Sequence, residues 1–502
     1  MRSKGEELAS LLAKQEDRRA AYWNRFDPFV DLRMKWRASM MRHLFHILPG
    51  QEILEIGAGN GEFTRSLVIA TRDECKITTV VFSSKYIDEI KGKLNNKNVD
   101  TVCLDSFPGL LGGKKFDCVI TNHMLEDHIR NEFLCTVKQL IKSGGGFLLF
   151  EPNPWNYYYH VRKLFRRLIP ADPISLTGLE AFSILSEIGY TQINVLPYDF
   201  LYPPIPKFLI WPAKNLSIIM ENFPCLRNLA GSLYIWARNP SFENEEQTTV
   251  DLCDHQIFFG KVSFVIPCHN EEMNVAPLIK GITDFYGKYV SEILIVDDNS
   301  TDRTAEVTEK LSKIYECVRL VKRSLPNGVG RALREGLNEA KGEYILIMDS
   351  DFQHIIPEIR DLFDVIEDGA DVAVGSRFSR ESVLVNYAFT KILANRAFHV
   401  LANILLGRHF RDISNNLKIF RRDVAKKLVI ESDDFAANVE TGLKPILLGY
   451  RVVEVPISWV NRSVDMGFST FRIFRTGPNY WKILLRLVWR RITKQPYQKE
   501  SS

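Results

Sequence analysis

Short runs of apolar, mostly β-branched residues alternate with longer stretches of helical character along this chain of 502 residues. Runs that are apolar at nearly every position predict strands buried on both faces, and connections long enough to hold a helix predict parallel pairing. We therefore expect an α/β fold with parallel sheets covered by helices. Ligands bind such sheets at the carboxyl ends of the strands. The runs are residues 53–57, 76–82, 100–105, 116–122, 145–152, 261–267, 291–298, 318–323, 343–351 and 370–377.

The runs form two groups, separated by a polar, acidic segment that shows neither the helical nor the strand period. This pattern is typical of a linker between domains. We expect a first domain over residues 1–240 with a helical extension at its start, a linker over 241–258 and a second domain over 259–502.

Composition excludes several classes of protein. A formal charge of +4 is too small to indicate nucleic-acid binding, and the eight cysteines contain no C-x-x-C pair. No uncharged stretch approaches the ~18–20 residues needed to span a bilayer, and the charged N-terminus lacks a signal-peptide core. The expected location is the cytoplasm, with peripheral contact to the cytosolic face of a membrane as an option.

A glycine-rich turn follows the first strand, with Gly57, Gly59 and Gly61 preceded by Glu55. Glycines allow the backbone to turn tightly and to approach a ligand. A dinucleotide-binding loop would need glycine at position 62, where Glu62 stands, so a pyrophosphate-binding role is disfavoured. The pattern resembles the first motif of class I S-adenosylmethionine-dependent methyltransferases.

This resemblance covers roughly residues 50–240 and implies a Rossmann-like domain with S-adenosylmethionine as its cofactor. It implies cofactor-binding roles for Glu55, Gly57, Gly59 and Asp105. One departure stands out. The family usually has an acid after the second strand that binds both ribose hydroxyls, and this chain has Phe82 there. A domain retained for packing or partner binding is the alternative.

Acidic side chains also follow the strands of the second group, and Asp349 and Asp351 flank one residue where an apolar strand ends. At such a turn two carboxylates can converge on one hard divalent cation. That cation can bridge a diphosphate and neutralise its charge as it leaves. The sequence therefore predicts a metal and diphosphate site.

The motifs over residues 261–490 closely resemble family 2 glycosyltransferases of the GT-A fold, with dolichol-phosphate mannose synthases and polyprenyl-phosphate glycosyltransferases as the nearest subgroup. The similar segments include residues 327–354, 369–378, 411–424 and 449–462. The resemblance implies nucleotide-sugar binding by Pro267, His269, Glu271, Val296, Asp298, Asp349, Ser350, Arg377 and Arg462. It implies Mg²⁺ or Mn²⁺ bound by Asp349, Asp351 and Gln353. Departures from the family pattern are His269 in place of the commoner Tyr, Asn415-Asn416 in place of Ser-Gly, and no Lys after Ser469.

The expected reaction moves a sugar from a nucleotide-diphosphate donor to a polyprenyl phosphate, with inversion. Such a phosphate is already anionic and needs no strong base, whereas a sugar hydroxyl would need one. Asp351, Arg377 and Glu440 are the expected catalytic residues, and Asp434 is a second candidate base. Two alternatives stay open. One is a bifunctional glycosyltransferase and methyltransferase acting on a cell-surface glycan, and the other is a glycosyltransferase whose first domain is a non-catalytic binding module.

The basic C-terminal segment from Arg472 to Arg491 contains Trp, Leu and Phe but no acid. We expect an interfacial helix at a membrane surface, and a helix docked on its own domain is the alternative. A second apolar surface is expected on residues 389–406. The predicted apolar stripe is Trp481, Leu484, Leu485 and Val488, beside Lys482, Arg486, Arg490 and Arg491.

Overall fold

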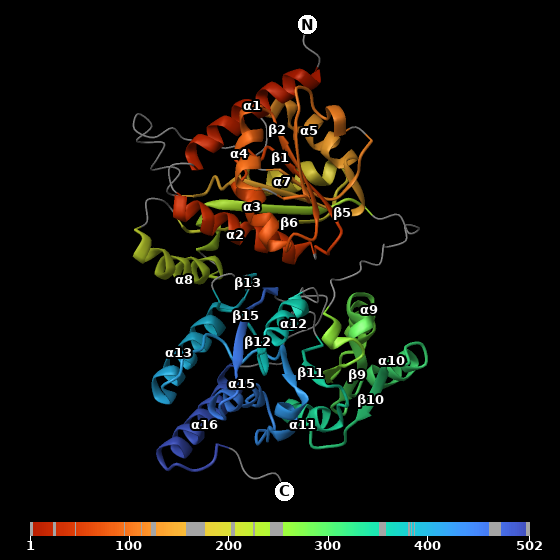
Figure 1. Ribbon diagram of the computed structural model, residues 1–502, viewed down its shortest axis with the longest axis vertical. Helices are drawn as coiled ribbons and strands as arrows, with labels where there is room; N and C mark the ends of the chain where they lie inside the picture. Colours follow the sequence, from red (N-terminus) through yellow and green to blue (C-terminus); the bar gives the residue numbers. More distant parts are fainter. Residues whose placement is uncertain are drawn as a thin grey trace. The chain divides into compact units, whose positions relative to one another are not determined.

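In a computed structural model the chain forms two compact units, residues 1–250 and 251–502 (Figure 1). The structure describes residues 4–23, 27–45, 47–94, 96–111, 113–121, 127–156, 176–201, 206–223, 226–240, 255–350, 358–379, 382, 384–385, 387–460 and 473–497.

The N-terminal unit is built on a seven-stranded sheet in the order β3-β2-β1-β4-β5-β7-β6. Strands β1 to β5 pair in parallel, whereas β7 runs antiparallel to both β5 and β6. The strands are β1 Glu52–Ile56, β2 Lys76–Val81, β3 Val99–Cys103, β4 Phe116–Thr121, β5 Ile141–Pro152, β6 Thr191–Tyr198 and β7 Ser232–Arg238.

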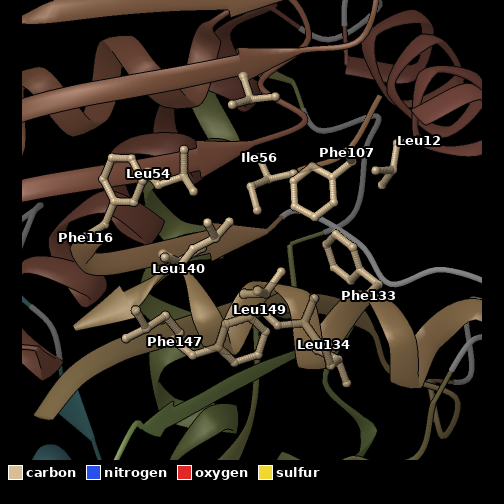
Figure 2. Packing of buried hydrophobic residues seen from close by; sticks show 14 of the residues in the cluster. Leu12, Leu54, Ile56, Phe107, Phe116, Phe133, Leu134, Leu140, Phe147 and Leu149 are labelled. Atoms are coloured by element: carbon tan, nitrogen blue, oxygen red, sulfur yellow. The ribbon is translucent and has the colours of Figure 1, made fainter. Parts of the chain in front are cut away.

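Helices pack on this sheet and bury one large apolar cluster. Figure 2 shows the aromatic residues Phe107, Phe116, Phe133 and Phe147 in this cluster, together with Leu12. The helices are α1 Lys4–Trp23, α2 Asp27–Leu44, α3 Glu62–Ala70, α4 Lys85–Lys93, α5 Asp127–Gln139, α7 Gly178–Glu187 and α8 Ile210–Glu221.

The C-terminal unit has its own seven-stranded sheet in the order β10-β9-β8-β11-β14-β12-β15. Here β14 runs antiparallel to both β11 and β12. The strands are β8 Val262–Cys268, β9 Val290–Asp297, β10 Val318–Lys322, β11 Tyr344–Ile347, β12 Val372–Ser376, β14 Lys418–Arg421 and β15 Val452–Pro456, and a separate pair consists of β13 Leu384–Val385 and β16 Trp459–Val460. The helices are α9 Glu272–Tyr286, α10 Thr304–Ser312, α11 Val329–Glu339, α12 Ile359–Glu367, α13 Phe389–Leu406, α14 Arg422–Lys427, α15 Ala437–Leu447 and α16 Ile473–Ile492.

The α/β class and the two sheets confirm the fold predicted from the apolar runs. The expected parallel pairing is found for most strands of both sheets, and the exceptions are β7 and β14, which are antiparallel to their neighbours. Strand β14 is four residues long and begins with the charged Lys418, so it lacks the continuous apolar run that marks the other central strands. Among the described helices, none combines the length and the apolar character needed to cross a bilayer.

Candidate functional site

The turn after β1 brings three glycines to the carboxyl edge of the first sheet. Gly57, Gly59 and Gly61 have φ angles of 75°, 56° and 78°, a region that favours glycine. Glu55 is fully buried in β1, and its carboxylate accepts a hydrogen bond from the Thr64 hydroxyl at 2.7 Å, which ties the strand to α3. A Cβ atom added at Gly57 would meet nothing within 4 Å, so the turn faces open space. This fits a turn on which the amino-acid part of a cofactor packs.

Helix α1 contributes a residue to the same edge that sequence reasoning missed. Glu16 is 3% exposed, and its Oε1 accepts the Gly59 N–H at 2.9 Å. Its Oε2 accepts the Phe82 N–H, also at 2.9 Å. Asp105 lies exposed in the loop after β3. The sequence signal for Glu16 is weak, because it is one of many charges in the N-terminal helix.

Strands β8, β9 and β11 place a second set of polar residues at the carboxyl edge of the C-terminal sheet. They are neighbours and parallel, with Pro267 of β8 level with Val296 of β9. His269 comes directly after β8, and its Nδ1 lies 3.0 Å from the Asp298 carbonyl oxygen. The next residue but one, Glu271, donates its backbone N–H to the Thr304 hydroxyl at 2.8 Å. These contacts hold the turns after β8 and β9 together.

Asp298 is buried and its carboxylate is fixed by the loop that follows β10. Oδ2 accepts the Gly328 N–H at 2.6 Å, and Oδ1 forms an ion pair with Arg323. Arg323 also donates to Glu335 at 2.9 Å. Val296, by contrast, is completely buried among the apolar residues between the sheet and α11. Its side chain belongs to the core, so only its backbone is available to a ligand.

Asp349 follows β11, and its Oδ1 accepts a hydrogen bond from Asn416 Nδ2 at 2.7 Å. One of the two asparagines that depart from the family pattern therefore braces the first predicted metal ligand. Ser350 beside it is 4% exposed. The described residues contain no group of three or more His, Cys, Asp or Glu side chains suited to a metal ion, and Asp351, Gln353 and Arg462 lie outside them.

Lys418, the first residue of β14, is fully buried. Its Nζ donates to the Asn438 carbonyl and to the Thr441 hydroxyl, both at 2.7 Å. Burial lowers the pKa of Lys418 to about 7, although the charges of Asp412 and Asp349 oppose that change.

The structure argues against direct phosphate contact by Arg377. Arg377 is 8% exposed as a residue. Its guanidinium donates two hydrogen bonds to the Asp412 carboxylate, at 2.7 and 3.0 Å. It also donates to the Tyr387 and Ser414 hydroxyls, each at 3.1 Å. Burial acts to lower the pKa of Arg377, but Asp412 and Tyr387 outweigh it and hold that pKa above its ordinary value. With its donors used in this way, Arg377 positions the loop after β12.

Glu440 does not have the setting of a general base. It is 1% exposed in α15, and its Oε2 accepts the Glu431 N–H at 2.6 Å. Its Oε1 accepts the Ser432 hydroxyl at 2.9 Å, and Lys444 Nζ lies 3.3 Å from Oε2. The carboxylate therefore fixes the segment before α15. Asp434, the second candidate base, accepts the Ala436 N–H at 2.9 Å and a hydrogen bond from Asn479 of α16.

The apolar stripe predicted on the C-terminal helix is divided between two faces of α16. Leu484 is fully buried and Val488 packs against the same cluster, so these two face the domain as the alternative prediction had it. Leu485 is exposed. Arg486 and Arg490 both pair with Glu431, at 3.0 and 2.7 Å, and of the two only Arg486 stays exposed. Over residues 477–492 of α16, the exposed large apolar side chains are Trp481, Leu485, Trp489 and Ile492.

Two family models match the chain, one in each unit. A model described as glycosyl transferase family 2 matches residues 263–429. A model described as a methyltransferase domain matches residues 53–145.

Curated relatives match the C-terminal family. The dolichol-phosphate mannosyltransferase of Pyrococcus furiosus is 32% identical over 202 residues, which are 40% of this chain and 56% of that protein. The polyprenol monophosphomannose synthase of Mycolicibacterium smegmatis is 30% identical over 209 residues, which are 40% of this chain and 78% of that protein. The chain thus spans little more than half the length of the first relative.

Among solved structures, the glucosyl-3-phosphoglycerate synthase of Mycobacterium tuberculosis in complex with uridine diphosphate aligns with a TM-score of 0.36 and 18% identity. The alignment covers 46% of this chain and 79% of that one.

Proposed function

This chain belongs to glycosyl transferase family 2, and from that premise we propose that its C-terminal unit moves a sugar from a nucleoside-diphosphate donor to a polyprenyl phosphate. The observation that carries the proposal is the shared edge of β8, β9 and β11. There Asp298 and Asp349 follow the two strands that flank β8, and each is held by a partner from elsewhere in the unit. The names of the two curated relatives support the choice of acceptor.

In this proposal the nucleotide lies against the turns after β8 and β9, near His269, Glu271 and Asp298. Asp349, Asp351 and Gln353 would hold a divalent cation, for which carboxylate and amide oxygens are suitable ligands. Such a cation neutralises the charge that develops on a leaving diphosphate. Asn416 keeps Asp349 in one orientation, so little reorganisation is needed when the donor binds.

The hydrogen bonds made by the two candidate bases, Glu440 and Asp434, favour a phosphate as the acceptor. A lipid phosphate brings its own anionic oxygen, so the protein has to position that oxygen and exclude water. Glu440 uses both carboxylate oxygens inside the fold, and Asp434 is held by Ala436 and Asn479. This favours an acceptor that needs no proton removed over a sugar hydroxyl.

A lipid acceptor also needs a surface at which the protein meets a bilayer, and we place it on the outward faces of α13 and α16. The two helices pack against each other, and Arg491 of α16 donates to the Leu405 carbonyl at 3.2 Å. Ile404 is 69% exposed and Trp489 62%, and Lys482 is an exposed basic residue on α16. Exposed apolar side chains with basic neighbours suit an anionic lipid surface.

The N-terminal unit supports a second activity, S-adenosylmethionine-dependent methyl transfer. The open space over Gly57 and the matched methyltransferase domain favour it. The cofactor supplies an electrophilic methyl group, and the turn from Gly57 to Gly61 would bind its amino-acid part. Both activities in one chain would suit successive modification of one glycan, which is the bifunctional alternative.

One experiment tests the glycosyltransferase proposal. The purified full-length protein is incubated with a panel of nucleotide sugars and Mn²⁺, with a short polyprenyl phosphate, with the matching polyprenol, or with neither. We expect release of nucleoside diphosphate and glycolipid formation with the phosphate only. Transfer to the polyprenol or to a sugar hydroxyl would contradict the proposed acceptor, and no release with any donor would contradict the activity.

Vesicle flotation tests the bilayer surface. The full-length protein should float with anionic vesicles, and less so as salt rises, because basic side chains near the leaflet are screened beyond ~10 Å. Trp489→Ser and Leu485→Ser should weaken flotation, since each removes exposed apolar area that the bilayer would bury. Ile314→Ser is the matched control, because Ile314 is 69% exposed and lies after α10. Equal loss in the control, or no flotation at all, would contradict this surface.

A further inference from the structure

Helix α8 stands between β6 and β7 in the chain and leaves from the carboxyl edge of the first sheet. Tyr198 at the end of β6 and Pro152 at the end of β5 are both level with Ser232, where β7 begins. The turn after β5 is tied to the chain before β7, because Asn153 Nδ2 donates to the Ala230 carbonyl at 2.7 Å. The segment from β6 to β7 therefore borders the edge at which ligands bind such sheets.

The face that α8 turns toward its unit is polar. Lys214, Ser217 and Glu221 follow one another at helical spacing, and Lys214 and Ser217 are buried. The Ser217 hydroxyl donates to Glu221 Oε1 at 2.6 Å and accepts the Phe200 N–H at 2.9 Å. Glu221 Oε1 also accepts the Asp199 N–H at 2.9 Å. Hydrogen bonds to the chain after β6 thus attach this face of the helix to the N-terminal unit.

The opposite face of α8 is apolar and exposed. Leu209, Pro212 and Leu216 recur at the same helical spacing, and Phe208 precedes them in the one-turn helix Lys207–Leu209. Phe208 is 79% exposed and Leu216 56%. A surface helix usually turns its apolar stripe to the core and its polar residues to solvent. In α8 this arrangement is reversed, which indicates that the outer face meets a partner.

The charges around this face favour a lipid surface as the partner. Among the described residues from 206 to 230, the exposed charged side chains are Lys207 and Arg227. The one acid of that range, Glu221, is bonded toward the unit. Exposed apolar side chains that have basic neighbours and no exposed acid suit an anionic leaflet.

Helix α7 of the same unit offers a contrast. Its exposed apolar side chains, Leu179 and Phe182, share the helix with the exposed acids Glu180 and Glu187. Carboxylates repel an anionic leaflet, so the exposed apolar side chains of α7 do not suit such a surface. One Leu and one Phe on α7 therefore provide a matched control for one Leu and one Phe at α8.

We propose that the face made by Phe208, Leu209, Pro212 and Leu216 is a surface through which the N-terminal unit contacts an anionic lipid bilayer. The choice of a bilayer rests on the proposed lipid-phosphate acceptor of the C-terminal unit, because that substrate brings the chain to a membrane. Each unit then meets lipid through its own helices, α8 in the first unit and α13 with α16 in the second.

Flotation of the full-length protein with vesicles of phosphatidylglycerol and phosphatidylcholine tests this surface. Three double variants each replace two exposed apolar side chains by serine, so they leave the packed interior unchanged, and thermal unfolding checks that they do. They are Phe208→Ser with Leu216→Ser at α8, Leu179→Ser with Phe182→Ser on α7 as the control, and Leu485→Ser with Trp489→Ser on α16.

We expect the α8 variant to lower the partition coefficient into vesicles about 10-fold or more, because each side chain that is removed would have buried apolar area in the bilayer. The α7 control should partition as the wild type does. Lys207→Gln should weaken partitioning about 5-fold at low salt, since a basic residue near an anionic leaflet contributes about that factor. At high salt the effect of Lys207→Gln should vanish, because salt screens the charge.

The outcomes separate the two lipid surfaces. If only the α16 variant loses binding, the surface on α13 and α16 stands and the one on α8 is overturned. Equal loss in the α8 and α7 variants would also overturn it, as would a wild-type protein that does not float. A dimer that the α8 variant converts to a monomer without loss of flotation would assign this face to a second copy of the chain, and so overturn the proposal. Sugar transfer to a short polyprenyl phosphate is measured without vesicles, so failure of the proposed acceptor and failure of this surface are seen separately.

Discussion

The two units carry sheets of the same size, but they bring carboxylates to their ligand-binding edges in different ways. In the C-terminal unit Asp298 directly follows β9, and Asp349 stands two residues after the end of β11. In the N-terminal unit the carboxylate between the two turns comes from Glu16, which is 66 residues before Phe82 in the chain. When no acid follows a strand in the sequence, a carboxylate from a distant segment can still lie at that edge of the sheet.

The two units stabilise buried charge in the same ways. A buried charge is costly unless it is paired or hydrogen-bonded. The C-terminal unit contains the pairs Arg377–Asp412 and Arg323–Asp298, and the N-terminal unit contains the buried pair Arg33–Asp199. Backbone N–H groups hold buried carboxylates in both units, Glu16 in the first and Glu358 in the second. Loss of one partner of a buried pair should therefore lower the stability of the unit that contains it.

The largest effect is expected at the metal site proposed for the C-terminal unit. Asp351→Asn removes an anionic ligand without changing volume, and a bound metal contributes several kcal/mol, so sugar transfer should fall at least about 100-fold. The measurement is glycolipid formation as a function of Mn²⁺ concentration. Asp284→Asn, an exposed change on α9, is the control. Unaltered transfer by Asp351→Asn would contradict the metal assignment.

Asp412→Asn should cause the largest loss of stability. It leaves the Arg377 guanidinium buried without its charge partner, and breaking a buried pair costs about 3–5 kcal/mol. Urea unfolding followed by a probe in the C-terminal unit measures the loss. Asp423→Asn breaks only an exposed pair with Arg421 and should cost less than about 1 kcal/mol. Similar losses in both variants would mean that the buried pair contributes no more to the free energy of unfolding than the exposed pair does.

A pH effect of somewhat smaller size is expected from His399 on α13. Burial lowers the pKa of His399 to about 4, although Asp412 opposes the change. The neutral ring also accepts the Ile413 N–H at 3.1 Å. Below pH 6.5 the imidazole of His399 becomes protonated in the unfolded chain but stays neutral in the folded protein. Because the unfolded state then binds more protons, the stability of the folded state falls as pH falls.

The loss should build up between pH 6.5 and about 4 and reach about 3 kcal/mol for His399 alone. Urea midpoints at pH 6.5 and pH 4.5 give the measurement. The variant His399→Gln should be less stable at pH 6.5 but show a flatter dependence on pH. An equally steep dependence in that variant would assign the effect to other groups.

The smallest effect is expected where α1 meets α4. Tyr86→Phe removes the hydroxyl that donates to Asp17, and a hydrogen bond to this half-exposed carboxylate is worth about 0.5–1 kcal/mol. Amide hydrogen exchange in α1 should become a few-fold faster, with exchange in β4 unchanged. Exchange that rises equally in both elements would mean that α1 opens only when the whole unit unfolds.

Sequence reasoning located the central strands, because a strand buried on both faces requires a continuous apolar run. It missed β6, β7, β14 and β15, whose pairing depends on neighbours that are distant in the chain. Arg377 and Glu440 were assigned to catalysis from family resemblance. In the structure their side chains form hydrogen bonds with other residues of the C-terminal unit. Residue type alone does not distinguish a charged side chain that binds a ligand from one that holds a loop in place.

The sequence by itself determined that this chain forms two α/β units, and that acids stand within two residues of the ends of β9 and β11. These features are local, since the apolar pattern of a strand and the residues at its end are consecutive in the sequence. Only the tertiary structure decided that Asn416 donates a hydrogen bond to Asp349, and that Glu16 accepts the N–H groups of Gly59 and Phe82. It also decided which apolar side chains of α16 are buried against the domain and which are exposed. Each of these is a contact between distant segments, and its free energy depends on packing that no local pattern encodes.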